Sequence, residues 1–144
     1  MTFFRHFATK DAVILDDGFD PAIAAAVAAT PASLSPVSRV CAGMRAALSD
    51  VDVPEQEQVR QRVRIAAQHP ALRMGMYANT EATREAVVGV LLDDGADEFA
   101  ARVAAAAVLV ALTVALQEWC LSDNEVSMSA YLNAALAVVD EGAA

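Results

Sequence analysis

Apolar residues recur along the chain at spacings of three and four, which is the period of an amphipathic α-helix. Prolines and capping residues mark the expected helix starts, because Asp20-Pro21 and Ser35-Pro36 each place a cap before a proline. Helices are predicted over residues 10–16, 21–29, 36–49, 54–69, 71–94 and 98–121, with a last one capped by Asn124 and ending near residue 141. Few residues alternate with a period of two, so the prediction is an all-α bundle of six or seven helices.

The last two predicted helices have the most distinctive patterns. No charged residue interrupts 103–116, so this alanine-rich helix is expected to be covered nearly all round. The helix after it carries an apolar stripe on one side. Two such helices from each of two chains would form a four-helix interface with two-fold symmetry. The interface residues predicted on this basis are Ala104, Val108, Ala111, Ala115, Leu132, Ala135, Leu136 and Val139. The alternative is a well-buried central helix of a monomer.

Composition and charge fit one soluble domain that is not a general binder of polyanions. The 144 residues are 56% hydrophobic, and much of this fraction is alanine, the strongest helix former. The net charge is -9, which repels DNA and anionic membrane surfaces. Residues 1–10 carry Arg5 and Lys10 and no acidic residue, so their net charge is +2 and that of the other 134 residues is -11. A basic end on an acidic body suits contact with phosphate at that end alone.

Motifs for catalysis, metal binding and export are not found. Cys41 and Cys120 form no CxxC pair, and His6 and His69 do not have the spacing of metal ligands. There is no GxSxG elbow, P-loop or GxGxxG turn. The start lacks a signal peptide, and the longest apolar stretch, 103–116, is shorter than the roughly 20 residues of a membrane span. We therefore expect a cytoplasmic protein that is not an enzyme and uses no membrane, metal or cofactor.

Residues 2–13, TFFRHFATKDAV, carry the most informative pattern. They resemble the end of the helix-turn-helix of TetR-family transcriptional regulators, where the recognition helix closes and a lysine opens the next helix. Residues 62–65 and 69–73, with the alanine-rich helix ending at Trp119, are similar to the C-terminal domains of the branch typified by mycofactocin-cluster regulators. The resemblance implies a TetR-like C-terminal helical bundle that forms a dimer through its last two helices.

The resemblance also implies roles for residues near the start. Thr2, Phe4, His6 and Lys10 occupy positions that contact the DNA backbone, although Phe4 stands where the family usually has tyrosine. Lys10 would lie in the first turn of a helix, where a cation is disfavoured unless it faces a phosphate. Without the surrounding pattern, the same residues would be ordinary solvated side chains.

Two regions are expected on this basis: residues 1–16, a remnant of the DNA-binding head, and 17–144, the ligand-binding and dimerisation domain. Met1 falls inside the recognition helix, so the base-reading residues are expected to be missing and this chain is not expected to bind DNA by itself.

The family also implies a small-molecule pocket inside the helical body. Such a pocket should be mostly apolar with a few polar anchors. The predicted lining residues are Met44, Ile65, Met74, Tyr77, Leu109, Thr113 and Gln117. Arg64 or Trp119 could stand at its rim, and plain core residues are the alternative for most of the set.

The function expected from the sequence is that of a ligand-responsive transcriptional regulator, a repressor. Its partners would be a second copy of the chain, a hydrophobic effector and, in the full-length form only, operator DNA. The alternative is a stand-alone module that binds a small molecule or pairs with a relative and has no DNA-binding activity.

Overall fold

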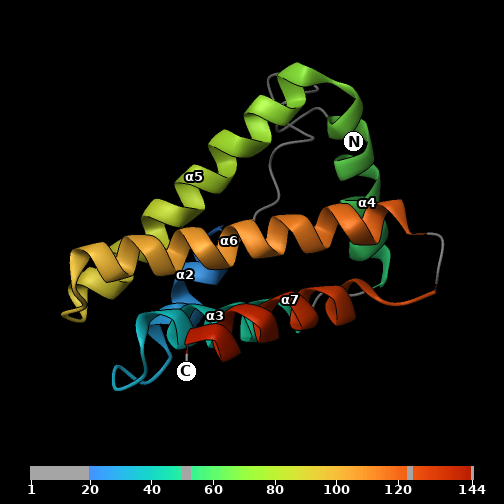
Figure 1. Ribbon diagram of the computed structural model, residues 1–144. Helices are drawn as coiled ribbons and strands as arrows, with labels where there is room; N and C mark the ends of the chain where they lie inside the picture. Colours follow the sequence, from blue (N-terminus) through green and yellow to red (C-terminus); the bar gives the residue numbers. More distant parts are fainter. Residues whose placement is uncertain (1–19, 50–52, 123–124, 144) are drawn as a thin grey trace, which may run out of the picture.

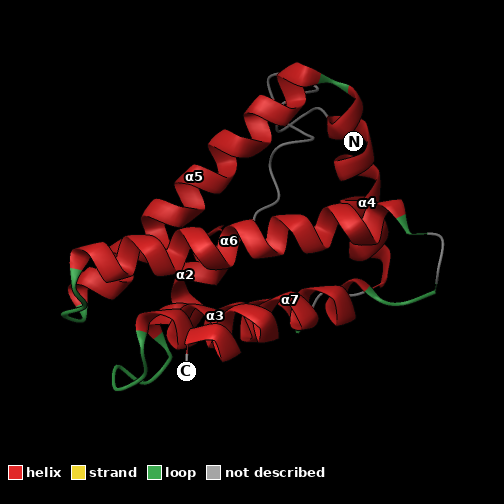
Figure 2. Cartoon of the chain, in the orientation of Figure 1, coloured by secondary structure: helices red, strands yellow, loops and turns green. Residues whose placement is uncertain are grey.

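A computed structural model describes residues 20–49, 53–122 and 125–143, which form six helices (Figure 1). They are α2 (Asp20–Ala28), α3 (Pro36–Leu48), α4 (Val53–Gln68), α5 (Pro70–Asp93), α6 (Glu98–Leu121) and α7 (Met128–Ala143). The described residues contain no strand (Figure 2). The all-α prediction is therefore confirmed, and the predicted helix over 10–16 lies outside the described residues.

Local capping explains where most of the helices begin and end. The side chain of Ser35 accepts a hydrogen bond from the backbone N–H of Ser38 at 3.2 Å, so α3 starts as predicted. Asp97 does the same for α6, accepting from the Ala100 N–H at 2.9 Å. After α5 the chain turns at Gly95, whose φ of 88° is accessible to glycine without strain.

The start of the last helix was predicted incorrectly. Residues 125–127 are not helical, and the cap of α7 is Ser127, whose hydroxyl accepts from the Ala130 N–H at 3.2 Å. Trp119 fixes the segment before it by donating its indole N–H to the carbonyl of Val126 at 3.1 Å. Asn124, the predicted cap, lies outside the described residues. This hydrogen bond comes from Trp119 on α6, so the helical spacing of apolar residues could not indicate it.

Helix α6 is central to the arrangement. It packs against α3, α4, α5 and α7, and α4 and α5 meet at Pro70 to frame a triangle with it (Figure 1). The interior between these helices and α2 is filled by apolar side chains. The largest that are fully buried are Met44, Leu91, Leu136, Val27, Val40, Val87, Val88 and Val108.

A buried arginine ties three helices together. Arg39 on α3 is 3% exposed and donates to the Val27 carbonyl at 3.2 Å and to the Thr30 hydroxyl at 3.0 Å, both at the end of α2. It also donates to the Asp94 carboxylate, which follows α5, at 2.7 Å. Because a buried charge is tolerated only when it is paired and hydrogen-bonded, this contact fixes the ends of α2 and α5 against α3.

Helix α7 is fastened to α3 along one side. The Asp140 carboxylate accepts from the Ser38 hydroxyl at 2.8 Å and from the Arg45 guanidinium at 3.2 Å. Leu132 and Leu136 lie in the apolar core of the chain. The polar contacts and the leucines therefore hold α7 onto the body of the same chain.

Candidate dimerisation and ligand-binding surfaces

Helix α6 has two apolar faces with opposite environments. Its inner face is made of small and medium side chains that are buried inside the chain: Ala101, Ala104, Ala105, Val108, Leu109, Leu112, Ala115, Trp119 and Cys120. The alanines on this face allow neighbouring helices to approach closely. The inner face is thus an ordinary helix-packing surface of the core.

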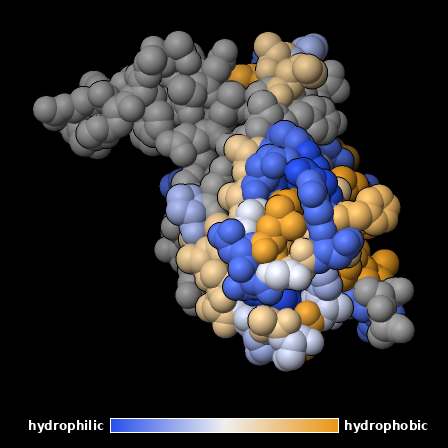
Figure 3. Space-filling view, turned by 90° about the vertical axis from the view of Figure 1, so that its left-hand side faces the viewer, coloured by the Kyte–Doolittle hydropathy of each residue, from blue (hydrophilic) through white to orange (hydrophobic). Residues whose placement is uncertain are grey.

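The outer face of α6 carries large apolar side chains that are exposed to solvent. Phe99 is 78% exposed, Val110 is 61% exposed and Leu121 is 76% exposed. Val103 and Val114 are exposed between them, and all five fall on one side of the helix at its natural period. We call these five residues the outer stripe. Seen from the end where α5 meets α6, hydrophobic residues reach the surface along one edge of the molecule (Figure 3).

The predicted interface residues lie mainly on the inner side. Ala104, Val108, Ala115, Leu132 and Leu136 are buried within the chain. Ala111, Ala135 and Val139 are partly buried. An interface through α6 and α7 would therefore rely mainly on residues that the sequence interpretation did not select, namely the outer stripe and Val138 of α7, which is 74% exposed. The partly buried members of the predicted set could contribute beside them.

Within the single chain, the outer stripe leaves one side of α6 exposed, so the helix would be covered nearly all round only if a partner lay against this side. Among the described residues, α6 is the helix that is long and apolar enough to cross a membrane, judged by length and composition. This is weak evidence for a span, because the core helix of a soluble protein passes the same test. Here one side of α6 is packed into the core and the other is exposed.

The predicted pocket residues are distributed over several environments. Met44 is fully buried and Leu109 nearly so, and both belong to the core. Thr113 is half-buried and donates its hydroxyl hydrogen to the Leu109 carbonyl at 2.9 Å. The remaining described members, Ile65, Met74 and Gln117, are exposed, and the side chain of Tyr77 lies outside the described residues. The structure thus brings Leu109 and Thr113 together on one turn of α6. Ile65 and Met74 lie on other helices, α4 and α5.

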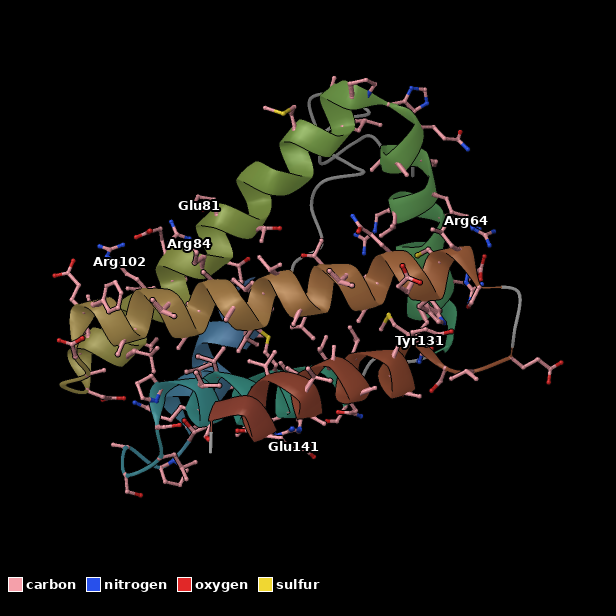
Figure 4. The ribbon with its side chains drawn as sticks, viewed as in Figure 1. Arg64, Glu81, Arg84, Arg102, Tyr131 and Glu141 are labelled. Carbon is pink, nitrogen blue, oxygen red and sulfur yellow. The ribbon has the colours of Figure 1, made fainter. Side chains whose placement is uncertain are left out.

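Two arginines of α4 meet the C-terminal end of α6. Arg64 donates its Nε–H to the carbonyl of Cys120 at 3.1 Å, and Arg60 donates from Nη1 to the carbonyl of Ser122 at 3.4 Å. The Arg60 guanidinium also lies over the ring of Trp119, 4.2 Å from its centroid. Figure 4 shows Arg64 beside this end of α6. Cationic side chains at a helix C-terminus satisfy its last carbonyls and interact favourably with its dipole.

The sequence interpretation named Arg64 and Trp119 as rim residues but missed Arg60. The structure joins all three at one place on α4 and α6. The available signal was the spacing of Arg60 and Arg64, which lie four residues apart and therefore on one face of a helix. What the spacing could not indicate was the partner, because α4 and the end of α6 are far apart in the sequence.

The two cysteines are buried thiols. Burial, together with the nearby Asp140 carboxylate and against the opposing effect of Arg45, raises the pKa of the Cys41 thiol to about 11. Burial also raises the pKa of Cys120, partly offset by Arg60 and Arg64. Both groups are accordingly protonated near neutral pH, and a thiol is a weak nucleophile compared with a thiolate.

We predict that both thiols react slowly with Ellman's reagent in the native protein at pH 8 and rapidly in guanidinium chloride.

The raised pKa of Cys41 also makes the stability of the fold depend on pH. Its contribution to stability is fully present below pH 9, the pKa of the thiol in the unfolded chain, and is lost as the pH rises from 9 toward 11. Denaturation midpoints measured across this range should fall in the wild type. They should fall less in Cys41→Ala, and an equal fall in both proteins would contradict the assignment.

The predicted DNA-backbone contacts, Thr2, Phe4, His6 and Lys10, lie outside the described residues, as does the boundary at residue 16. Within the described parts of the chain, no three histidine, cysteine or acidic side chains are grouped so that they could hold a metal ion.

Comparison with known proteins gives one family. The family model described as the MftR C-terminal domain, a TetR-type C-terminal domain, matches residues 34–144. This range begins in the loop before α3 and includes α3 to α7. A search of curated proteins found no significant match.

Proposed function

The chain belongs to the TetR-type regulators with an MftR C-terminal domain, and from this premise we propose that it is the effector-binding and dimerising body of a transcriptional repressor. The observation that carries the proposal is the family match over 34–144, which includes α3, α4, α5 and α7, the described helices that pack most closely against α6. Regulation, not catalysis, is the role typical of this family. We expect the full-length form to act in the cytoplasm on operator DNA, with Thr2, Phe4, His6 and Lys10 at positions that contact the backbone. The chain by itself is not expected to bind DNA.

The proposed dimer uses the outer faces of α6 and α7. Monomeric soluble proteins rarely expose a continuous row of large apolar side chains, and such rows mark interaction sites. The outer stripe runs from Phe99 at one end of α6 to Leu121 at the other, and Val138 adds to it from α7. A second copy of the chain would cover it, giving a four-helix interface of two α6 and two α7 helices.

The proposed effector site lies among α4, α5 and α6. Helix α4 is held by few apolar contacts, since Val63 and Ala66 are the buried positions among its described side chains. Displacing a helix with little buried apolar surface requires little free energy. An apolar effector that lodged beside Leu109 and Thr113 could therefore shift α4 and, through the body, alter the spacing of the two DNA-binding heads. Ile65 and Met74 would become covered in that complex.

The proposal is tested by native mass spectrometry and light scattering on freshly purified protein. We expect a species of twice the 15.1 kDa chain mass, together with small molecules that co-purify with it. A stabilising effector raises the melting temperature in proportion to the logarithm of its concentration, so adding the extracted molecules back should raise it. A chain that stays monomeric at high micromolar concentration, with no stabilisation by the extract, would contradict the proposal.

A further inference from the structure

The arginines of the described residues differ in how their charge is balanced. Four of them contact carboxylates directly: Arg39 with Asp94, Arg45 with Asp140, Arg84 with Glu81 and Glu85, and Arg102 with Glu98 and Glu85. Figure 4 shows Glu81, Arg84 and Arg102 near one another on α5 and α6. Arg60 and Arg64 instead donate to carbonyl oxygens. In a chain with 19 acidic residues and 10 basic ones, two neighbouring arginines without a hydrogen-bonded carboxylate are unexpected.

Arg60 carries an unsatisfied donor. Its Nε–H is buried and has no hydrogen-bond acceptor within the described structure. The nearest carboxylate oxygen, Oε2 of Glu57, is 4.0 Å away, which is too far for a hydrogen bond. A buried donor left without a partner costs about 1–3 kcal/mol. The Arg60 side chain as a whole is 18% exposed, so an acceptor on a ligand could reach this donor after a shift of the side chain and would then remove the cost.

Arg64 leaves most of its guanidinium available. Its Nε–H is used by the Cys120 carbonyl, but the side chain is exposed, and among the described residues Nη1 and Nη2 have no acceptor. Arginine presents its donors in a planar fork that matches the two oxygens of a carboxylate or phosphate. Arg60 and Arg64 lie on one face of α4, so a single anion could accept from both.

Both arginines act electrostatically on the C-terminal end of α6. Burial and Glu57 raise the pKa of the Cys120 thiol, whereas Arg60 and Arg64 lower it. The indole of Trp119 lies against Arg60 and provides an apolar wall beside the charge.

We propose that Arg60 and Arg64 form a binding site for the carboxylate or phosphate group of a small amphipathic ligand. The apolar part of the ligand would extend from α4 toward α5 and α6. This inference rests on the proposed effector binding and deepens it by naming the chemistry that the effector carries: an acidic group on an apolar body.

Trp119 allows the site to be observed directly, because it is the single tryptophan of the chain and lies under Arg60. Its fluorescence would be followed while octanoate, octyl phosphate, 1-octanol or inorganic phosphate is added at constant ionic strength. We expect a saturable change with octanoate or octyl phosphate, at about tenfold lower concentration than with octanol, since hydrogen bonds to charged groups are worth at least this factor. Comparing octanoate with octyl phosphate separates the two sources of negative charge.

The variant Arg64→Gln removes the exposed guanidinium without removing a buried group, and it should weaken octanoate binding about tenfold or more. Arg60→Lys keeps the charge but deletes the fork, and it should weaken binding as well. The matched control is Arg84→Gln, an arginine on α5 that is fully paired with carboxylates, which should bind as the wild type does.

The outcomes distinguish the anion site from the proposed function. Equal binding of octanol and octanoate, unchanged in Arg64→Gln, would leave apolar effector binding in place and overturn the anion site. A response to inorganic phosphate that depends on Arg64 but gains nothing from an octyl chain would support the anion site and contradict an amphipathic effector. No fluorescence response to any of the four compounds would overturn the inference.

Discussion

Gly43→Ala is expected to lower the free energy of unfolding by about 2 kcal/mol or more. A Cβ atom at this position would lie 2.8 Å from both the Cα and the backbone nitrogen of Val27, and 2.5 Å from its Cγ2. Side chains can rotate away, but the two backbone contacts can be relieved only if α2 moves off α3. The Arg39 hydrogen bonds to Val27 and Thr30 oppose this movement. The gain in helix propensity, about 1 kcal/mol, offsets only part of the cost.

The matched control for this prediction is Gly89→Ala, which makes the same chemical change inside α5. No atom lies within 4 Å of a Cβ placed there, so only the gain in propensity remains. Thermal unfolding at one fixed protein concentration should show a fall of about 6 °C for Gly43→Ala and a rise of about 3 °C for Gly89→Ala. Similar shifts for both variants would mean that α2 does not approach α3 as closely as described.

The boundaries of most helices could be predicted from the sequence because the signals are local. Ser35-Pro36, Pro70 and Asp97 each act within one helical turn, so their neighbours in the sequence are also their neighbours in space. The cap of α7, Ser127, is a local signal of the same kind, and the prediction missed it by choosing Asn124. The conformation of the segment before α7 could not be predicted in this way. The hydrogen bond from Trp119 to Val126 holds the preceding segment in a non-helical conformation, and this contact becomes visible only when the end of α6 is in place.

The orientation of α6 could not be predicted for a different reason. A hydrophobic pattern identifies a buried face by contrast with a polar one, and here both faces are apolar over 103–116. The alanine face was chosen for the dimer because small residues permit close approach. The same property suits packing inside the chain, where Ala104 and Ala115 are in fact buried. The position of α3, α5 and α7 decides which face is left outside.

The Arg60–Arg64 site illustrates a limit set by distance along the chain. The spacing of the two arginines predicts that they lie on one face of a helix. Their carbonyl partners, on residues 120 and 122, are more than 50 residues away in the sequence. The same holds for the buried Arg39, whose carboxylate partner Asp94 is 55 residues away in the sequence. Local patterns predict elements, whereas these polar contacts depend on how the elements pack.

Val110→Glu is expected to convert the proposed dimer to monomers. Val110 is at the middle of the outer stripe, so each dimer would bury two carboxylates that lack basic partners among the stripe residues. Burying an unpaired charge costs about 4 kcal/mol or more, which corresponds to at least a thousandfold weaker association. The substitution also makes the net charge of each chain more negative by one than the wild-type value of -9, which increases the repulsion between the two chains. Sedimentation velocity over a range of concentrations measures the change.

The fold of the single chain should survive Val110→Glu. The Val110 side chain is 61% exposed, so a carboxylate at this position would be hydrated in the monomer. Helical circular dichroism should therefore remain unchanged while the mass halves. Ile65→Glu places the same charge on an exposed apolar residue of α4, away from the outer stripe, and should leave the dimer intact. If Val110→Glu sediments as a dimer, the second copy does not bind through this face. If the wild type is itself monomeric, the proposed dimer is contradicted.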